Sequence, residues 1–408
     1  LVFSWPAEAA EVVVGGLTAA DVRLYELTAS VGTGGAVVET VRLDSATVSG
    51  AGPFDVRFRI DPIPEVPDGE DRTFAIVGAN GITVPSGPEF TEDTVSDLRD
   101  TTTQADIVVV ANATVLGGGA SLQALLSHRL AAQGLTSKIA DIRDVEDEFN
   151  DGLPGPVAIR NFLAWVMSDA PGEGWADPKP TYLLLYGDGS YDYKAGEPAG
   201  NYVPTQVLFK DDPSIGYYAS DNVLAAVVGA DQLADLVVGR IPGRSSAAAD
   251  VVVDKILDYE QTPAPGDWTR HTLFMSDRGK GSDPTFEALE FERLNDEGAK
   301  YIDAPPHTIK KLRYFSDFGA GPANPMRQAI KDGVNGDDEF TGAALAQFVG
   351  HGNFVVWSDD AFFDERFSPR DTEDLVNGSR LPWLLVHNCL TGGFHTTQPF
   401  SMGEDWLN

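Results

Sequence analysis

The sequence predicts an α/β protein in which a parallel-sheet region of two α/β subdomains follows a small all-β sandwich domain. Up to about residue 95, short alternating or β-branched runs recur between Gly, Pro, Asp and Ser turns, and no segment has the helical period. From Ala105 onward, continuous apolar strands alternate with helical segments, which is typical of a parallel sheet covered on both faces. A chain of 408 residues is also long enough for two or three domains.

Residues 1–95 form the first predicted region. The runs "EVVVGG", "DVRLYELT" and "FDVRFRID" each have the length and composition of a strand. A small β-sandwich is the natural way to bury one face of such strands. We expect a polar linker over residues 96–104, after which the pattern changes.

Residues 105–265 are predicted to form the first α/β subdomain. The strand "ADIVVVA" is followed by the helix "GASLQALLSHRLAAQG", which should end at Gly134. "TYLLLYGDGS" has the composition of a buried strand, and "SSAAADVVVDKILDYE" that of a helix opened by serines. The Pro- and Gly-rich join "QTPAPGDW" then leads into residues 266–408, the second subdomain.

Three strands of this second subdomain run into chemically active residues. "HTLFMS" precedes Asp277, "AALAQFV" precedes Gly350-His351-Gly352, and "LPWLLVHN" precedes Cys389. Ligands of open parallel sheets bind at the carboxyl ends of the strands. Since neighbouring strands lie only about 4.8 Å apart, a histidine just past one strand end can reach a thiol past the next.

Cys389 is the only cysteine of the chain, and two interpretations of it are open. A free thiol is often a small buried hydrophobe. A thiol beside a histidine is instead the arrangement of a nucleophile, Cys389, and its base, His351. The N–H groups of Gly352 and Cys389 can then receive an oxyanion, and Asp277 can orient the imidazole.

Each of these assignments has a competitor. His387 lies two residues before Cys389 and rivals His351 as the base, but we expect it to pack within or beside the sheet. His395, on the following loop, is a weaker rival. A carboxylate that ends a strand, as Asp277 does, is often only a helix cap.

Composition excludes several classes of function. The net charge of −33, from 62 acidic and 29 basic residues, excludes a general nucleic-acid binder, which needs clustered Lys and Arg. One cysteine excludes an internal disulfide, and no apolar run approaches the ~20 residues of a membrane span. Because the chain starts at Leu1 without a methionine, we expect it to be a processed or trimmed piece of a longer product.

With these residues placed, the chain resembles the gingipain family of cysteine peptidases from about Ala105 onward. The resemblance rests on six motifs in this order: "TYLLLYGDGSYDY", "NYVP", "YYASDNVLA", "LADLVVGRIPGRSSAAADVVVDKILDYE", "FVGHGNFVVWSDD" and "LPWLLVHNCLTGGF". It implies a caspase-like catalytic fold and an exported bacterial endopeptidase, secreted or on the cell surface, that acts on proteins or peptides. It also makes residues 1–95 an accessory or propeptide-like segment.

The resemblance further implies roles for individual residues. Cys389 matches the nucleophile, His351 the general base and Gly352 the oxyanion-hole glycine, while Asp277 falls where the family places its triad acid. Asp283 matches the carboxylate that receives arginine in Arg-specific members, although Asp283 can equally cap the helix that begins at Pro284.

Two expectations concern ligands and completeness. The chemistry requires no cofactor, but family members bind structural calcium, for which Asp188 and Asp192 are candidate ligands, although Asp in a turn is commonly a capping residue. The chain ends 19 residues past Cys389, where family members continue the sheet. We therefore expect a C-terminal segment or a second chain to complete the catalytic subdomain.

The leading hypothesis is thus a cysteine endopeptidase that uses a Cys-His pair, with Arg or Lys before the cleaved bond as the candidate preference. A sortase-like transpeptidase, in which an amine replaces water as the acceptor, is the first alternative. The second is a catalytically inactive α/β module for adhesion or surface assembly.

Overall fold

The computed structural model describes the backbone of seven strands between residues 2 and 78 and most of the chain from residue 96 to 407. The gaps in the second range are residues 213–214, 281–282, 303, 320–322 and 397–399. The chain divides into two compact units, Leu1–Thr94 and Val95–Asn408.

The first unit is built from antiparallel strands in two sheets. One sheet has the order β1-β7-β3-β4 and the other the order β2-β6-β5. The strands are β1 (Val2–Pro6), β2 (Ala10–Leu17), β3 (Val22–Gly32), β4 (Gly35–Arg42), β5 (Thr47–Ser49), β6 (Phe54–Ile60) and β7 (Asp71–Gly78). The prediction of an all-β N-terminal region is confirmed.

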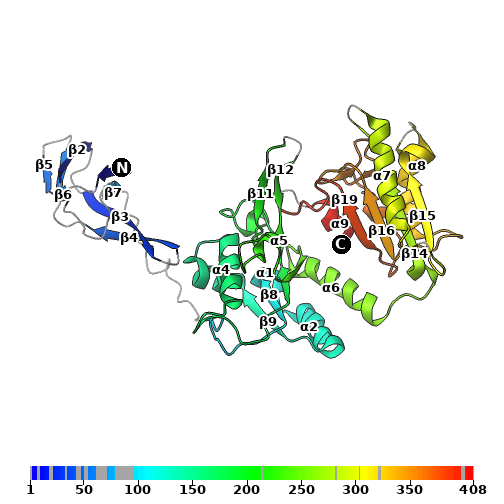
Figure 1. Cartoon of the computed structure of the whole chain (residues 1–408), viewed down its shortest axis with the longest axis horizontal. Coiled ribbons are helices and arrows are strands. Elements are labelled where there is room, and N and C mark those ends of the chain that lie inside the picture. The colour runs from blue at the N-terminus through cyan, green and yellow to red at the C-terminus, as the bar shows by residue number, and fades with distance from the viewer. Residues whose placement is uncertain are drawn as a thin grey trace. The chain divides into compact units, whose positions relative to one another are not determined.

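The second unit begins with a parallel sheet of order β13-β10-β8-β9. Its strands are β8 (Ile107–Ala111), β9 (Ser137–Asp141), β10 (Tyr182–Tyr186) and β13 (Val237–Ile241). Its helices are α1 (Ala113–Leu116), α2 (Ala120–Gln133), α3 (Ile142–Asn150), α4 (Pro156–Val166), α5 (Asp221–Leu224) and α6 (Ser246–Gln261). The hairpin of β11 (Val207–Lys210) and β12 (Gly216–Ala219) projects from this subdomain (Figure 1).

Both faces of this first parallel sheet are buried. Val108 and Val110 of β8 pack against α3 and α4, whereas the intervening Val109 packs in the core that holds α2 and α6. Local signals set the helix ends as predicted. Gly134 ends α2 with φ of 74°, and the side chain of Ser245 accepts a hydrogen bond from the first turn of α6.

The second parallel sheet has the order β15-β14-β16-β19. Its strands are β14 (His271–Ser276), β15 (Thr308–Arg313), β16 (Leu345–Val349) and β19 (Trp383–His387). The remaining elements are α7 (Pro284–Ala299), α8 (Asn324–Asn335), β17 (Val356–Trp357), β18 (Phe363–Asp364) and α9 (Met402–Leu407). Short helical turns occur at Glu197–Ala199, Asp267–Arg270, Tyr314–Phe318 and Thr372–Asp374.

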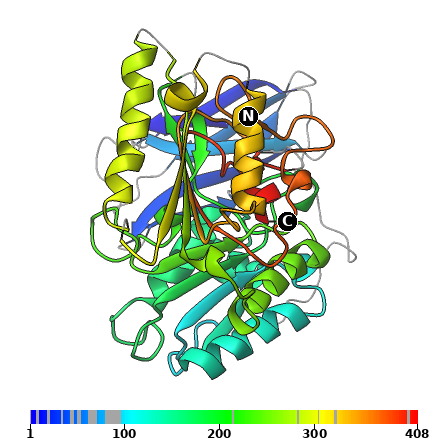
Figure 2. The same cartoon turned by 90° about the vertical axis from the view of Figure 1, so that its right-hand side faces the viewer.

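Helices α7 and α8 cover opposite faces of this second sheet, as Figure 2 shows. On the α8 side, Met275 and Phe348 belong to an apolar core that includes Ile330 of α8. On the α7 side the contact is partly polar, because the side chain of Asn295 donates to the carbonyl of Met275 at 2.9 Å. The predicted architecture of two covered parallel sheets is therefore confirmed. Among the described residues, no helix is long and apolar enough to cross a membrane.

Candidate active site

The register of the second sheet brings the carboxyl ends of β14, β16 and β19 level with one another. Ser276 of β14 pairs with Val349 of β16, and Val349 pairs with His387 of β19. His351 and Cys389 therefore each lie two residues past a directly paired position on neighbouring strands. The ladder continues past the strand ends, since the N–H of Gly350 donates to the carbonyl of His387 at 3.2 Å.

Asp277 follows β14 and is fully buried. Its Oδ2 accepts the backbone N–H of His351 at 3.0 Å, and its Oδ1 accepts the N–H of Arg278 at 2.7 Å. Burial raises the pKa of the Asp277 carboxyl to about 6, although the hydrogen bonds from Ser358, His351 and Arg278 act to lower it. Asp277 thus holds the main chain of the histidine loop, whereas the sequence predicted a bond to the imidazole ring.

Gly350 and Gly352 flank His351 for steric reasons. A Cβ on Gly350 would lie 2.2 Å from the Cβ of Asp277, and one on Gly352 would lie 2.1 Å from Nδ2 of Asn388. A side chain at Gly350 would overlap buried Asp277, and one at Gly352 would displace the side chain of Asn388, so glycine on each side of the histidine lets the loop pack against both neighbouring strand ends.

The imidazole of His351 lies against helix α7. Its Nε2 is 3.3 Å from Oε1 of Glu287, an ion-pair distance without hydrogen-bond geometry, and its ring packs edge-on against Phe291 at 5.5 Å. Glu287 is not among the site residues that the sequence predicted. The available signal was the spacing of four between Glu287 and Phe291, which places both on one face of the helix that follows β14.

Cys389 is exposed, which contradicts the interpretation of a small buried hydrophobe. The turn that carries it is fixed by its neighbours. Nδ2 of Asn388 donates to Oγ1 of Thr391 at 2.7 Å, and Nε1 of Trp357 donates to the same oxygen at 3.0 Å. The thiol therefore lies on a turn that these hydrogen bonds fix, and it is accessible to solvent.

The N–H groups of Cys389 and Gly352 are predicted to form an oxyanion hole. The first lies in this turn and the second in the loop of His351. Gly352 forms a β-bridge with Trp357 in which the flanking residues exchange the bonds: Asn353 N–H donates to Val356, and Ser358 N–H donates to His351. Neither the N–H of Gly352 nor that of Cys389 donates to another residue in the part of the chain that the structure describes. Both N–H groups are thus free to donate to a ligand.

The two rival histidines differ in their surroundings. His387 ends β19 and so lies within the sheet, as expected, but its side chain is exposed and not packed. The physical reason is that β19 is an edge strand, a position that local sequence does not reveal. His395 is buried, with Nε2 3.3 Å from the carbonyl of Tyr217, and burial lowers the pKa of this histidine.

Asp283 is the N-cap of helix α7. Its Oδ1 accepts the N–H of Phe286 at 3.1 Å, and Pro284 is the first residue of the helix. Asp283 is also exposed, so its carboxylate has room for a further partner. The capping alternative is present in the structure, and the role in arginine binding stays a prediction.

Asp188 and Asp192, the candidate calcium ligands, both accept hydrogen bonds within the chain, and calcium binding by them stays a prediction. Both oxygens of buried Asp188 are engaged, one by Nε of Arg244 at 2.6 Å and the other by the N–H of Gly189 at 2.8 Å. Asp192 accepts the N–H of Ala195 at 3.1 Å. Over the described residues, no group of three or more His, Cys, Asp and Glu side chains is arranged to hold a metal ion.

Comparison with known proteins places the chain in a family. The family model described as Peptidase family C25 matches residues 100–408. Gingipain R2 of Porphyromonas gingivalis strain W83 is 25% identical over 247 residues, which is 60% of this chain and 28% of that protein. Gingipain R1 of the same species is 24% identical over 252 residues, 61% of this chain and 21% of that protein. The chain thus spans less than a third of the length of these relatives.

A solved structure supports the same fold. The crystal structure of the Arg-specific cysteine proteinase gingipain R is similar with a TM-score of 0.52 at 20% identity, covering 78% of this chain and 60% of that one. The caspase-like catalytic fold implied by the sequence resemblance is therefore confirmed.

Six buried carboxyls among the described residues have raised pKa values for a common reason, which is loss of hydration. Burial raises the pKa of Glu146, and it raises the pKa to about 6 for Asp188, Asp277 and Asp405 and to about 7 for Glu365 and Glu404. The folded chain therefore binds protons that the unfolded chain releases near pH 4. The stabilising contribution of these groups is complete below about pH 4 and is lost as the pH rises through about 6 to 7.

We predict that the melting temperature is higher at about pH 5.5 than at about pH 8, by roughly 5 °C or more. His395 acts in the opposite direction, since its lowered pKa makes the folded chain lose stability as the pH falls through the ordinary range of a histidine, but it is one group against six carboxyls. Differential scanning fluorimetry over this range measures the trend, and Glu365→Gln and Glu404→Gln should each flatten it. A melting temperature that rises from about pH 5.5 to about pH 8 would contradict the assignment.

Proposed function

This chain belongs to peptidase family C25, a family of gingipain-like cysteine peptidases, and from that premise we propose that it is an endopeptidase with Cys389 as nucleophile and His351 as general base. The observation that carries the proposal is the register of β16 and β19, in which both residues follow paired positions by two residues. The exposed thiol of Cys389 supports it, because a nucleophile must be reachable by a polypeptide.

The proposed reaction has two steps. The Cys389 thiol transfers its proton to His351, and the sulfur bonds to the scissile carbonyl carbon while the N–H groups of Gly352 and Cys389 stabilise the oxyanion. The C–N bond then breaks as His351 protonates the leaving amine. Water, deprotonated by His351, hydrolyses the thioester and releases the second product.

Two carboxylates have different proposed roles. Asp277 positions the histidine loop through the main chain, as its bond to the N–H of His351 suggests. Glu287, 3.3 Å from the imidazole, is the acid that orients the ring and stabilises the imidazolium. The assignment of the triad acid by family resemblance, Asp277, is thus modified in the proposal.

Variants of the three groups test this mechanism. Cys389→Ala should abolish peptide cleavage, His351→Ala should lower kcat about 10²- to 10⁴-fold, and Glu287→Gln should lower it about tenfold or more. The exposed rival His387 supplies the matched control, since His387→Ala should leave kcat within about twofold. Circular dichroism checks that each variant is folded. Loss of activity in a folded His387→Ala together with an active His351→Ala would exchange the two assignments.

Analysis of the products and labelling of the thiol separate the alternative functions. A sortase-like transpeptidase would give amine adducts, detected by mass spectrometry when a peptide amine is added, in place of hydrolysis products. An inactive surface module would yield no product and a thiol that iodoacetamide alkylates slowly at neutral pH, because only an activated thiolate reacts fast.

Cleavage after Arg or Lys is the proposed specificity. It is supported by the relative described as an Arg-specific cysteine proteinase and by the exposed carboxylate of Asp283 at the start of α7. A carboxylate can accept both arms of a guanidinium. The net charge of −33 would also attract basic substrates.

A panel of fluorogenic peptides that differ only in the residue before the cleaved bond tests this specificity. We expect Arg or Lys to be preferred, and the preference to fall about tenfold or more in Asp283→Ala. Asp283→Asn, which keeps a helix-capping side chain, separates loss of the charge from loss of the cap. A preference for apolar or acidic residues would exclude this pocket.

The free edge of the second sheet supports a further proposal, that another segment or chain completes this subdomain. Trp383 of β19 is 70% exposed and His387 is exposed on the same strand. An edge strand that presents a large aromatic side chain is normally covered. We expect hydroxyl-radical labelling of Trp383 to be severalfold weaker in the protein isolated from its source than in this chain, and equal labelling would count against a covering segment.

Two other expectations remain proposals. Export of the protein would be tested by fractionation of the source cells. The propeptide role of residues 1–95 would be tested by comparing the activity of the intact chain with that of residues 96–408, because full activity of the intact chain would leave only an accessory role.

A further inference from the structure

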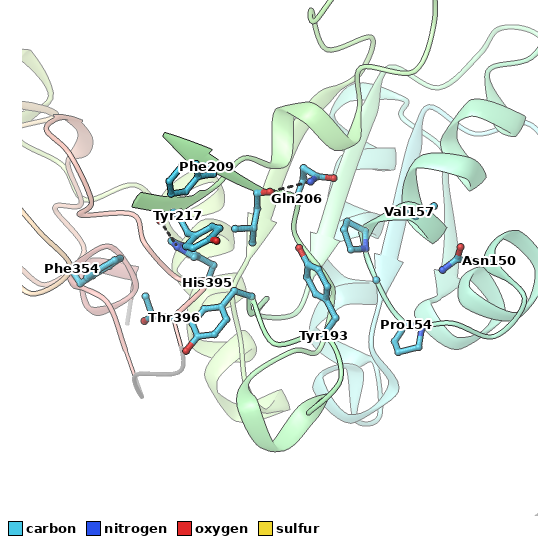
Figure 3. Close-up of a pocket in the computed structure, with 14 residues that line it drawn as sticks. Asn150, Pro154, Val157, Tyr193, Gln206, Phe209, Tyr217, Phe354, His395 and Thr396 are labelled. Atoms are coloured by element: carbon cyan, nitrogen blue, oxygen red, sulfur yellow. Dashed lines mark hydrogen bonds between the residues drawn. The ribbon is translucent and has the colours of Figure 1, made fainter. Parts of the chain in front are cut away.

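A groove of about 840 Å³ lies between the two subdomains of the second unit, beside the candidate active site. One wall is the β11–β12 hairpin with Val207, Phe209 and Tyr217. The other wall consists of Phe354, His395 and Thr396. Figure 3 shows these last residues at one end of a row of side chains that runs past the hairpin to Pro154 and Asn150.

The groove differs chemically from the rest of the surface. None of its fourteen lining residues is Asp, Glu, Lys or Arg, although the chain carries 62 acidic and 29 basic residues. Five of the lining residues are Phe or Tyr, and two of these, Phe209 and Tyr217, are 61% and 65% exposed. Exposed aromatic residues that gather in a concave, uncharged site are typical of a surface that binds apolar partners.

The groove is continuous with the catalytic loops. Phe354 is three residues past His351, so the Cα atoms of the two residues are at most about 11 Å apart. His395 is six residues past Cys389 and packs edge-on against Phe354 with ring centroids 6.0 Å apart. The loops that carry the candidate nucleophile and base thus continue directly into the wall of the groove.

Hydrogen bonds hold both walls in place. The N–H of Tyr191 donates to the carbonyl of His395 at 3.0 Å, and Nε2 of His395 lies 3.3 Å from the carbonyl of Tyr217. The carbonyl of Phe354 accepts the N–H of Met402 at 2.6 Å. Phe209 and Tyr217 pair across the hairpin with ring centroids 5.1 Å apart. The site is therefore formed before any ligand binds, which limits the entropy lost on binding.

We propose that this groove binds an apolar, aromatic-containing stretch of the polypeptide substrate, beginning about three residues from the scissile bond. The inference rests on the proposed peptidase function, and it adds a second determinant of specificity to the residue at the cleaved bond. An extended chain advances about 3.3 Å per residue, so about three residues of substrate cover the distance of at most about 11 Å from His351 to Phe354, and the hairpin forms the facing wall. Uncharged walls favour Phe, Tyr, Leu or Val side chains over charged ones.

Paired peptides test the proposal. The short peptide holds only the residues next to the cleaved bond, and the long peptides add two aromatic residues three to six positions away, on one side or the other. We expect one long peptide to have a kcat/KM about tenfold to a hundredfold above that of the short one, from burial of two aromatic side chains. Phe209→Ala/Tyr217→Ala should bring the ratio of long to short kcat/KM close to one.

Two controls show whether the change in kcat/KM comes from aromatic residues bound in the groove. Tyr301→Ala removes an aromatic residue that is 89% exposed and lies outside the groove, and it should leave the ratio unchanged. Long peptides with serine in place of the aromatic residues should behave like the short peptide. Equal kcat/KM for long and short peptides, or a ratio that survives in Phe209→Ala/Tyr217→Ala, would overturn the inference.

A binding measurement separates this inference from the proposed function. Fluorescence anisotropy of the labelled long peptide on Cys389→Ala needs no turnover. Saturable binding that is lost when Phe209→Ala/Tyr217→Ala is added supports the groove even if the intact chain cleaves no peptide, in which case only the peptidase proposal fails. Binding that the two substitutions leave unchanged counts against the groove, whatever the activity of the chain.

Discussion

The parallel pairing of β16 with β19 is the constraint on which the candidate site depends. Phe348 of β16 and Val386 of β19 are paired and both contribute to the apolar core under α8. Because side chains alternate along a strand, a slip of one residue would bring His387 to that core in place of Val386. The packing of the core therefore fixes the register, and the register fixes the separation of His351 and Cys389. In this sense the chemistry of the site is set by residues that never meet a substrate.

A buried carboxylate and two glycines convert this register into a fixed loop. Asp277 loses hydration at the end of β14, and in return accepts the main-chain N–H groups of His351 and Arg278. The pKa of Asp277, raised by burial to about 6, indicates that these bonds offset only part of the desolvation. The absent side chains of Gly350 and Gly352 let the loop approach its neighbours closely. Stability is thus given up at the point where the candidate base is positioned, as is common at functional sites.

The sequence predicted what local pattern controls. Continuous apolar strands predicted both parallel sheets, and the polar residues at the ends of those strands predicted the candidate pair His351 and Cys389. The sequence-based predictions failed where the answer depends on how helices and strands are arranged in space. The contact of Glu287 with the imidazole needs the position of α7 over the sheet, and the exposure of His387 needs the knowledge that β19 is an edge strand. Asp188 and Arg244 form an ion pair although they are 56 positions apart in the sequence, and no local pattern can predict a partner over such a separation.

The first α/β subdomain contacts the candidate site through the segment that follows Cys389. Beyond the turn of Cys389, the guanidinium of Arg240 lies 4.8 Å from the centroid of the Phe394 ring, and the carbonyl of His395 accepts the N–H of Tyr191. Further on, Nζ of Lys255 donates to the carbonyl of Leu407 at 2.8 Å. The loop of Cys389 is therefore anchored on one side by β19 and on the other by the first subdomain. A loop fixed at both ends keeps fewer conformations than one fixed at a single end, so less entropy is lost when the thiol and a bound peptide are brought together. On this reasoning, the subdomain that carries neither His351 nor Cys389 contributes by holding the loop of the candidate nucleophile and by supplying the hairpin wall of the neighbouring groove.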